Sequence, residues 1–240
     1  MEHDDGFSFG LGVFETMLVV GDRCVMMERH LDRMNRGLET IGLGRRMEPE
    51  MMEGIVSDGH LDGRILKIEV SERNTVVSDR PVPYTPEDYE RGFVLRTSAV
   101  RRNETSPFTF IKSLQYGDSI MEKRRARSEG FDEPLFLNGR GEICEGATTN
   151  IFFTDGRKIV TPDISCGMLP GTVRSYVLER FDVEEKSILP GDIGSFSGCF
   201  VTNSVLGIMP VSGIDGFAFT DRSVTDSVRA RYERDISEGL

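Results

Sequence analysis

The spacing of hydrophobic and polar positions in the first third of the chain predicts a strand hairpin, two helices and a further strand. Between residues 29 and 41, apolar side chains recur at helical spacing, and Gly42 follows as a helix stop signal. Residues 64–72 alternate between apolar and polar side chains, as in a strand with one buried face. We expect the hairpin over residues 10–27 and a second, weaker helix over residues 47–57.

A proline-rich segment suggests a boundary between two domains. Residues 80–86 contain three prolines, which disfavour regular structure because proline lacks a backbone N–H and fixes φ. We therefore expect a linker here, with a small α+β domain over residues 1–85 and a larger domain over residues 86–240.

Short β-hairpins dominate the expected structure of the larger domain. A strand is expected over residues 92–100, and turn sequences at Gly139-Arg-Gly141, Asp155-Gly156 and Asp215-Gly216 each separate two apolar segments. Helices are expected over residues 113–130, after Gly171 and from Thr220 onward. The first segment is rich in helix-forming residues, and the other two are amphipathic. The fold class is therefore α+β, and the larger domain should contain an antiparallel, barrel-like sheet with a few helices.

Composition and charge limit the classes of partner. The chain has 240 residues, is 38% hydrophobic and carries a net charge of -11, which favours a globular protein and disfavours binding to nucleic acid or an anionic membrane. No segment is long and apolar enough to span a bilayer, and the acidic start does not resemble a signal peptide, so a cytoplasmic location is expected. The four cysteines lie far apart, which suggests reduced thiols and no zinc site.

Lys112 is the first candidate for chemistry. It follows an apolar lead-in of Phe108, Phe110 and Ile111, although lysine is seldom buried without a partner. One interpretation is a surface lysine whose stem covers apolar neighbours while its amine reaches water. The other is a partly desolvated amine that acts as a nucleophile or forms a Schiff base.

Two segments of the larger domain could bind an anion. Leu169-Pro-Gly-Thr-Val-Arg174 precedes or opens a predicted helix, whose first backbone amides would suit a phosphate. Thr202-Asn-Ser204 interrupts two apolar strands with hydroxyl and amide groups. The first signal is weak by itself because most helices begin without binding a ligand, and the second segment is also compatible with an ordinary turn.

Taken in order, six segments resemble the pyridoxal-phosphate enzymes of aminotransferase class IV, the fold-type IV family. The resemblance extends from about Phe7 to Val211 and implies a two-domain fold, with a small α/β N-terminal domain and a C-terminal domain that carries the Schiff-base lysine. The segments are Gly12-Val-Phe-Glu-Thr16, His30-Leu-Asp-Arg33, Ile111-Lys-Ser-Leu-Gln-Tyr116, Glu145-Gly-Ala-Thr-Thr-Asn150, Leu169-Pro-Gly-Thr-Val-Arg174 and Thr202-Asn-Ser204.

The resemblance also implies pyridoxal 5'-phosphate as the cofactor and a role for each matching residue. Lys112 would form the Schiff base, and Glu145 would face the pyridine nitrogen and hold its proton. Arg33 would bind the phosphate, whereas Arg36 is interpreted as a solvated charge. The other implied cofactor-binding residues are Tyr116 at the ring hydroxyl, Leu169 on the ring face, Thr172, Val173 and Ser204 at the phosphate, and Thr148, Asn150 and Gly171 in the same segments.

The reaction is less constrained than the cofactor. Phe14-Glu-Thr16, the polar loop over residues 102–107 and Thr202-Asn-Ser204 are more similar to 4-amino-4-deoxychorismate lyases, which eliminate pyruvate and leave 4-aminobenzoate, a folate precursor. Thr16 would then contact the substrate or assist proton transfer, although it could equally be a β-branched strand residue.

Two alternatives remain beside the lyase. One is a transaminase of the D-amino-acid or branched-chain type, and the other is a protein that binds the cofactor without catalysis. Arg101, Arg102 and Arg174 are candidate partners for a substrate carboxylate. The resemblance implies a small-molecule amino substrate and a homodimer.

Overall fold

The computed structural model describes residues 1–240, with the exception of the side chain of Asp58, and divides the chain into two compact units. The first unit comprises Met1–Pro83, Phe110–Tyr116 and Gly239–Leu240. The second comprises Tyr84–Thr109 and Gly117–Glu238. The segment that carries Lys112 thus groups with the first unit, which differs from the expected division at residue 85. Backbone hydrogen bonds to the first strand, described below, explain this grouping.

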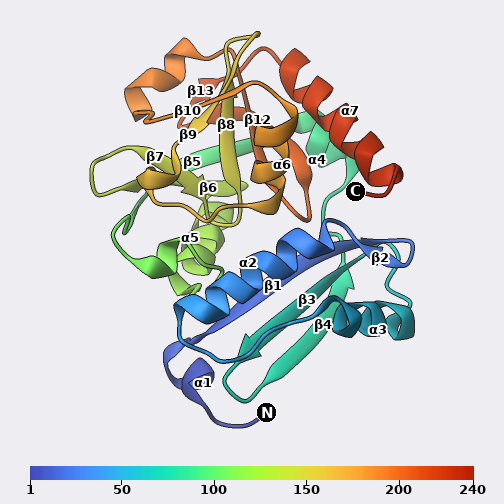
Figure 1. Ribbon diagram of the computed structural model, residues 1–240. Coiled ribbons are helices and arrows are strands. Elements are labelled where there is room, and N and C mark those ends of the chain that lie inside the picture. Colours follow the sequence, from blue (N-terminus) through green and yellow to red (C-terminus); the bar gives the residue numbers. More distant parts are fainter. The chain divides into compact units, whose positions relative to one another are not determined.

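The first unit contains a four-stranded sheet covered on one face by helices (Figure 1). The strand order is β2-β1-β3-β4, and the strands span Arg23–Cys24, Gly12–Val20, Arg64–Ser71 and Thr75–Pro81 in that order. The helices are α1 (Asp5–Phe9), α2 (Met27–Thr40) and α3 (Pro49–Gly59). The expected elements between residues 10 and 72 are present, although the second strand of the hairpin is only two residues long.

Side-chain alternation along β1 gives this sheet two chemically different faces. Val13 and Met17 point toward α2, where they form a buried core with Leu31, Met34 and Leu38. Glu15 shares that face because it lies two residues from each of them. The side chains of Phe14 and Thr16 therefore point to the opposite face.

The expectation of a linker without regular structure over residues 80–86 was wrong at both ends. Strand β4 continues through Pro81, which pairs with Arg64. Since β4 is the edge strand of the sheet, a proline is tolerated there. Helix α4 (Pro86–Arg91) begins at the other end, with Thr85 in a capping box and Pro86 in the first turn, where its missing N–H is not needed.

The second unit is built on a nine-stranded sheet that closes on itself. Six strands form a ring in the order β8-β11-β12-β5-β6-β7, and the pairing of β7 with β8 closes it. The sheet is mixed and not wholly antiparallel as expected, because β5 runs parallel to both β6 and β12, and β9 runs parallel to β10. The strands are β5 (Phe93–Arg102), β6 (Glu133–Asn138), β7 (Ile143–Gly146), β8 (Asn150–Thr154), β9 (Ile159–Pro162), β10 (Val183–Lys186), β11 (Gly198–Asn203), β12 (Gly207–Ile214) and β13 (Phe217–Ala218).

Helices pack around this sheet, whose interior holds a large apolar core. The core includes Leu135, Ile151, Phe153, Val201 and Met209, all inaccessible to solvent. The remaining α-helices are α5 (Gly117–Ser128), α6 (Thr172–Arg180) and α7 (Ser223–Ser237), and short 3-10 helices span Pro107–Thr109, Ile164–Cys166 and Pro190–Ser195. Helix α5 starts four residues later than expected. The α+β fold class is confirmed.

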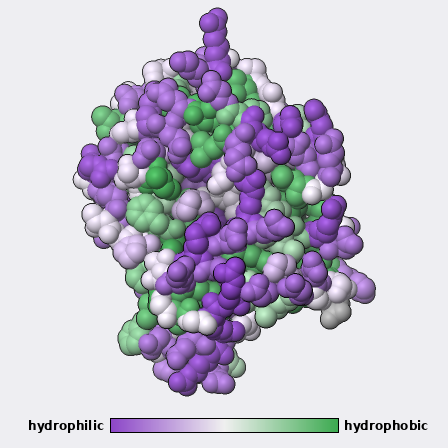
Figure 2. Space-filling model, viewed as in Figure 1, coloured by the Kyte–Doolittle hydropathy of each residue, from purple (hydrophilic) through white to green (hydrophobic). Residues whose placement is uncertain are grey.

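The described residues bear on three expectations, which concern disulfides, metal binding and membrane spans. All four cysteines are buried free thiols. Within the part of the chain that the structure describes, no group of three or more potential ligands could hold a metal ion. No helix among the described residues meets the length and hydrophobicity needed for a membrane span. Figure 2 shows hydrophilic side chains over much of the visible face, with scattered apolar residues between them.

Candidate active site

Lys112 is attached to the first strand of the sheet by backbone hydrogen bonds. The Phe14 N–H donates to the Lys112 carbonyl at 2.8 Å, and the Leu114 N–H donates to the Gly12 carbonyl at 2.9 Å. Val13 and Ser113 form an antiparallel bridge between these bonds. The lysine is therefore held on a short strand-like extension of the sheet.

Two aromatic rings surround the amine of Lys112. Its Nζ lies 4.4 Å from the centroid of the Phe14 ring and 4.9 Å from that of Tyr116. The two rings meet edge to face, with centroids 5.1 Å apart. Lys112 and Tyr116 are both half-buried. An aromatic face attracts a cation and excludes water on that side, so these rings restrict the position of the amine.

A second lysine approaches the same ring. The Nζ of Lys67, on β3, lies 4.8 Å from the Phe14 centroid and 2.7 Å from Oε1 of Glu69. Lys67 is paired in register with Thr16, which is half-buried. The sheet thus places Phe14, Thr16 and Lys67 on one face, and the amines of Lys67 and Lys112 both lie close to the Phe14 ring. The sequence interpretation did not single out Lys67.

Arg33 lies on α2 and is fixed by a buried carboxylate on β1. Its Nε donates to Oε1 of Glu15 and its Nη2 to Oε2, both at 2.7 Å. His30 Nδ1 lies 2.7 Å from the same Oε2. Glu15 and His30 are inaccessible to solvent, and Arg33 is 7% exposed. Arg36 is exposed, as expected for a solvated charge.

The second unit holds the carboxylate expected at the pyridine nitrogen. Glu145, on β7, is buried, and its Oε1 lies 3.1 Å from Nε of Arg102. Its Oε2 accepts a hydrogen bond of 3.1 Å from the backbone N–H of Leu169. The Arg102 guanidinium also lies 4.0 Å from the centroid of the Phe136 ring. The orientation of Glu145 is therefore set by a cation and an amide on separate segments.

Hydrogen bonds connect the three segments expected to bind the cofactor in this unit. Asn150 donates through Nδ2 to the Leu169 carbonyl at 2.9 Å, which joins the glutamate segment to the start of α6. Asn203 donates through Nδ2 to the Thr148 carbonyl at 3.0 Å, and this bond joins the glutamate segment to the turn after β11. Ser204 is the first residue of that turn. The structure thus brings these segments together within the second unit.

A buried ionic network of Glu133 and Lys123 also binds Thr148. Its N–H and hydroxyl lie 2.7 and 3.0 Å from Oε1 of Glu133, a carboxylate that is inaccessible to solvent. Lys123, on α5, lies 2.8 Å from the other oxygen of Glu133 and donates to the Thr148 hydroxyl at 2.7 Å. Because the hydroxyl is already engaged by two groups, this network suits a structural role for Thr148.

The N-terminus of α6 offers backbone amides that could bind an anion. Gly171 is the N-cap residue and provides no side-chain cap, and the first two helical residues, Thr172 and Val173, are buried. A Cβ at Gly171 would collide with Oδ1 of Asn150. Only a glycine therefore lets the turn approach Asn150 this closely while the helix amides point outward from the first turn.

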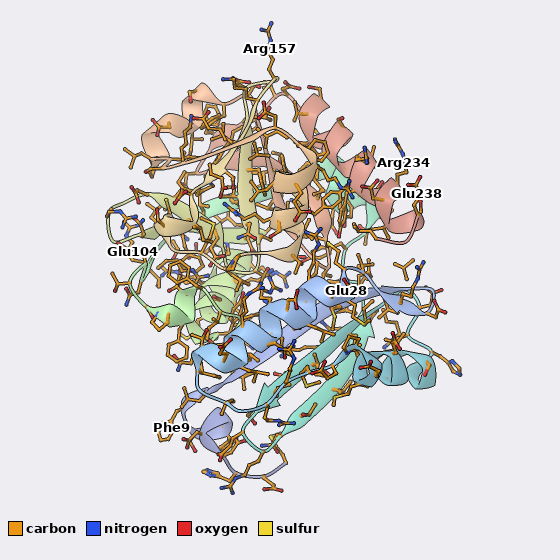
Figure 3. All side chains as sticks on the ribbon, viewed as in Figure 1. Phe9, Glu28, Glu104, Arg157, Arg234 and Glu238 are labelled. Carbon is orange, nitrogen blue, oxygen red and sulfur yellow. The ribbon has the colours of Figure 1, made fainter. Side chains whose placement is uncertain are left out.

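Two of the three arginines considered for a substrate carboxylate have other partners. Arg102 pairs with Glu145, and Arg174 is buried, pairs with Glu185 and donates to the Pro162 carbonyl at 3.0 Å. Arg101 is exposed. Glu104, labelled in Figure 3, lies in the loop that follows β5 and accepts a hydrogen bond from the Gly139 N–H at 3.1 Å. Lys67, in the first unit, is likewise paired with a carboxylate, that of Glu69.

Sequence reasoning missed Glu15, His30, Lys67 and the pairing of Arg102 with Glu145. Some signals were present. His30 and Arg33 are separated by three positions on a helix and so share a face, and Glu15 is a charge inside an otherwise apolar strand. The Arg102 pairing had no local signal, because its partner lies more than forty residues away.

Each unit carries groups that fit part of pyridoxal phosphate. The first supplies an amine between two aromatic rings and a fixed arginine. The second supplies a buried carboxylate, which suits a pyridinium proton, and a helix N-terminus, which suits a phosphate. Among the predicted residues, Thr16, Arg33, Lys112 and Tyr116 belong to the first unit, and Glu145, Thr148, Asn150, Leu169, Gly171, Thr172, Val173 and Ser204 belong to the second.

Comparison with known proteins gives the family. The model of the family described as amino-transferase class IV matches residues 12–214. The chain is 25% identical to the aminodeoxychorismate lyase of Bacillus subtilis, over 97% of this chain and 88% of that protein. It is also 25% identical to a probable branched-chain-amino-acid aminotransferase of Rickettsia felis, over 94% of this chain and 87% of that protein.

A solved structure shares the fold. It is a putative 4-amino-4-deoxychorismate lyase from Legionella pneumophila, with a TM-score of 0.86 and 22% identity over 97% of this chain and 94% of that chain. The family match over residues 12–214 includes every residue predicted to bind the cofactor. The chain therefore belongs to the class IV aminotransferase family, and it is a pyridoxal-phosphate-dependent enzyme of the aminotransferase or lyase type.

Proposed function

We propose that this enzyme is a 4-amino-4-deoxychorismate lyase, which releases pyruvate from its substrate and leaves 4-aminobenzoate. The observation that carries the proposal is the face of β1 and β3 that holds Phe14, Thr16 and Lys67 beside the amine of Lys112. Thr16 supplies a hydroxyl on this face and Lys67 supplies an amine that is paired with Glu69, and both groups suit a polar substrate that bears carboxylates. They suit a purely aliphatic side chain less well, because a lysine amine is costly to desolvate against one.

Lys112 has the central role in this proposal. Bound pyridoxal phosphate supplies an electron sink that stabilises negative charge at the substrate carbon. The amine of Lys112 would accept the proton from that carbon as a general base. The electron pair left behind would displace the enolpyruvate oxygen from the neighbouring ring carbon, which makes the remaining ring aromatic as 4-aminobenzoate. Lys112 would then return the proton to the departing enolpyruvate, which becomes pyruvate. Thr16 is proposed to contact the substrate or to assist this proton transfer.

The remaining roles are those that the family resemblance implies. Tyr116 is proposed to bind the ring hydroxyl of the cofactor, and Leu169 to pack on the ring face. Glu145 is proposed to hold the proton of the pyridine nitrogen, with Arg102 and the Leu169 amide fixing its two oxygens. Arg33, the first amides of α6 and Ser204 are proposed to bind the phosphate.

A transaminase is the second candidate, since relatives of similar identity include a probable branched-chain-amino-acid aminotransferase. The two reactions differ in one requirement. A transaminase needs a keto acid to complete its cycle, whereas the lyase does not. An inactive cofactor-binding protein is the third candidate, and the presence of both Lys112 and Glu145 argues against it.

A cytoplasmic homodimer is proposed on the family resemblance, and light scattering of the purified protein tests the dimer.

The test is pyruvate release by the enzyme reconstituted with pyridoxal phosphate, supplied with aminodeoxychorismate and no keto acid. Catalytic release that is lost in Lys112→Ala supports the lyase. If the enzyme shows the visible absorbance of lysine-bound cofactor but releases no pyruvate, the lyase proposal fails. A screen of L- and D-amino donors with keto acids would then identify the transaminase substrate.

A further inference from the structure

Glu15 is a charged residue at a buried core position, where proteins ordinarily have apolar side chains. It lies between Val13 and Met17 on the face of β1 that packs against α2, and all three are 1% exposed or less. Taking a carboxylate out of water costs several kcal/mol unless charged partners and hydrogen bonds compensate for it. A residue that served only the core of this unit would not need that charge.

Both oxygens of Glu15 are engaged by α2. Arg33 binds side-on through Nε and Nη2, at 2.7 Å each, and His30 Nδ1 lies 2.7 Å from Oε2. Side-on binding by two parallel hydrogen bonds fixes the plane of a guanidinium as well as its position. Arg33 is therefore held in one orientation by groups that are themselves buried on rigid elements.

The ionisation of the cluster follows from its surroundings. Burial alone would raise the pKa of Glu15, but the charge of Arg33, and then the interaction with His30, holds that pKa below its usual range. Burial lowers the pKa of His30, against the opposing effect of Glu15, and the positive charges of Arg33 and Lys112 lower it further. Since an ionised carboxylate can only accept, a neutral His30 must carry its proton on Nδ1 to donate to Glu15.

We infer that Glu15 and His30 are positioning residues that hold the guanidinium of Arg33 in the orientation that binds the cofactor phosphate. This inference depends on the phosphate-binding role proposed for Arg33. It assigns the buried carboxylate and imidazole a function that neither has by contact with substrate or cofactor. Arginine has several rotatable bonds, so an unheld guanidinium would lose conformational freedom on binding phosphate, and a held one loses less.

Glu15→Gln provides the principal test, with pyridoxal phosphate and unphosphorylated pyridoxal as the two probes. The variant keeps the size of the side chain but replaces one acceptor oxygen with a donor, so it cannot accept both bonds from Arg33. Both probes react with Lys112, and only one carries a phosphate. Titration is followed by visible absorbance, which does not depend on turnover.

The expected result is a loss of affinity confined to the phosphorylated probe. Glu15→Gln should bind pyridoxal phosphate at least about tenfold more weakly than the unaltered enzyme, the typical effect of losing a charge-assisted hydrogen bond. Its affinity for pyridoxal should change less than about twofold. Asp4→Asn is the matched control, because Asp4 is another buried carboxylate of the first unit, bonded to Ser71 and Asn74. It should leave both affinities unchanged.

His30→Phe keeps the test decisive if Glu15→Gln does not fold. It removes one hydrogen bond to Glu15 but keeps a ring in the core, and it should weaken pyridoxal phosphate binding selectively and by a smaller factor. Equal losses for both probes, or no loss for pyridoxal phosphate, would overturn the positioning role. If Arg33→Gln binds the two probes with the same relative affinities as the unaltered enzyme, the phosphate role of Arg33 itself fails, which is a separate and recognisable result.

Discussion

Phe14 contacts Lys112 at both ends of the lysine. Its backbone N–H donates to the Lys112 carbonyl at 2.8 Å, and its ring centroid lies 4.4 Å from the Lys112 Nζ. One residue of β1 thus fixes the backbone of Lys112 and contacts its amine. The lysine proposed to form the Schiff base is therefore positioned by the first strand of the sheet.

Replacing the ring of Phe14 should weaken cofactor binding without removing the backbone bond. Cation–π contacts contribute about 0.5–2 kcal/mol, so Phe14→Leu should reduce the affinity for pyridoxal phosphate by about 2- to 30-fold. Absorbance titration measures the effect, and Phe14→Tyr, which retains the ring, is the control. An unchanged affinity in Phe14→Leu would show that the ring does not orient the amine.

Neutralising Glu145 should slow the reaction more than it weakens binding. Glu145→Gln keeps an oxygen for Arg102 or Leu169 but cannot hold a pyridinium proton by charge. We expect kcat to fall by about 10- to 100-fold, which corresponds to the loss of one hydrogen bond to a charged group. Steady-state kinetics with saturating cofactor gives the measurement. A variant with the original kcat would exclude Glu145 from the proposed role.

Adding one methyl group at Gly171 should disturb the proposed phosphate site. The new Cβ would collide with Oδ1 of Asn150, whose amide is tied to the Leu169 carbonyl at 2.9 Å. We expect Gly171→Ala to weaken binding of pyridoxal phosphate by about tenfold or more, since the first turn of α6 must shift. Gly191→Ala is the matched control in the same unit, where a Cβ meets open space. Equal affinities in the two variants would contradict this arrangement.

Acid should destabilise the second unit through Glu142. Hydrogen bonds from Arg140, and then from Asn138 and Ser187, lower the pKa of Glu142 from 4.5 to about 2. Its contribution to stability is therefore complete above pH 4.5 and is lost as the pH falls toward 2. We expect the urea midpoint to fall between about pH 5 and pH 3, and to fall less in Glu142→Gln. A fall of the same size in both proteins would contradict the shift.

Local patterns predicted much of this protein, and non-local contacts account for most of what was missed. The apolar stripe of residues 29–41 predicted α2 because helix formation depends on neighbours a few positions away. The closing pair β7–β8 and the parallel neighbours of β5 depend on strands far apart in sequence, so hairpin signals alone suggested a wholly antiparallel sheet.

The same distinction holds for the site. Lys112 and Glu145 were proposed as site residues because each lies in a recognisable segment. Lys67 was part of an ordinary alternating strand, and only its register opposite Thr16 and its distance from the Phe14 ring show that it lies on the same face as these residues. A strand over residues 75–81 was not expected; its one proline, Pro81, disfavours a strand, a preference that an edge position relaxes.

The most direct measurement is the balance of products in the absence of a keto acid. Purified enzyme with bound pyridoxal phosphate is mixed with aminodeoxychorismate, and pyruvate and 4-aminobenzoate are quantified together over many turnovers. We predict equal amounts of the two products from the unaltered enzyme and neither from Lys112→Ala. Transfer of the amino group only after a keto acid is added, with no release of pyruvate, would contradict the lyase and establish a transaminase.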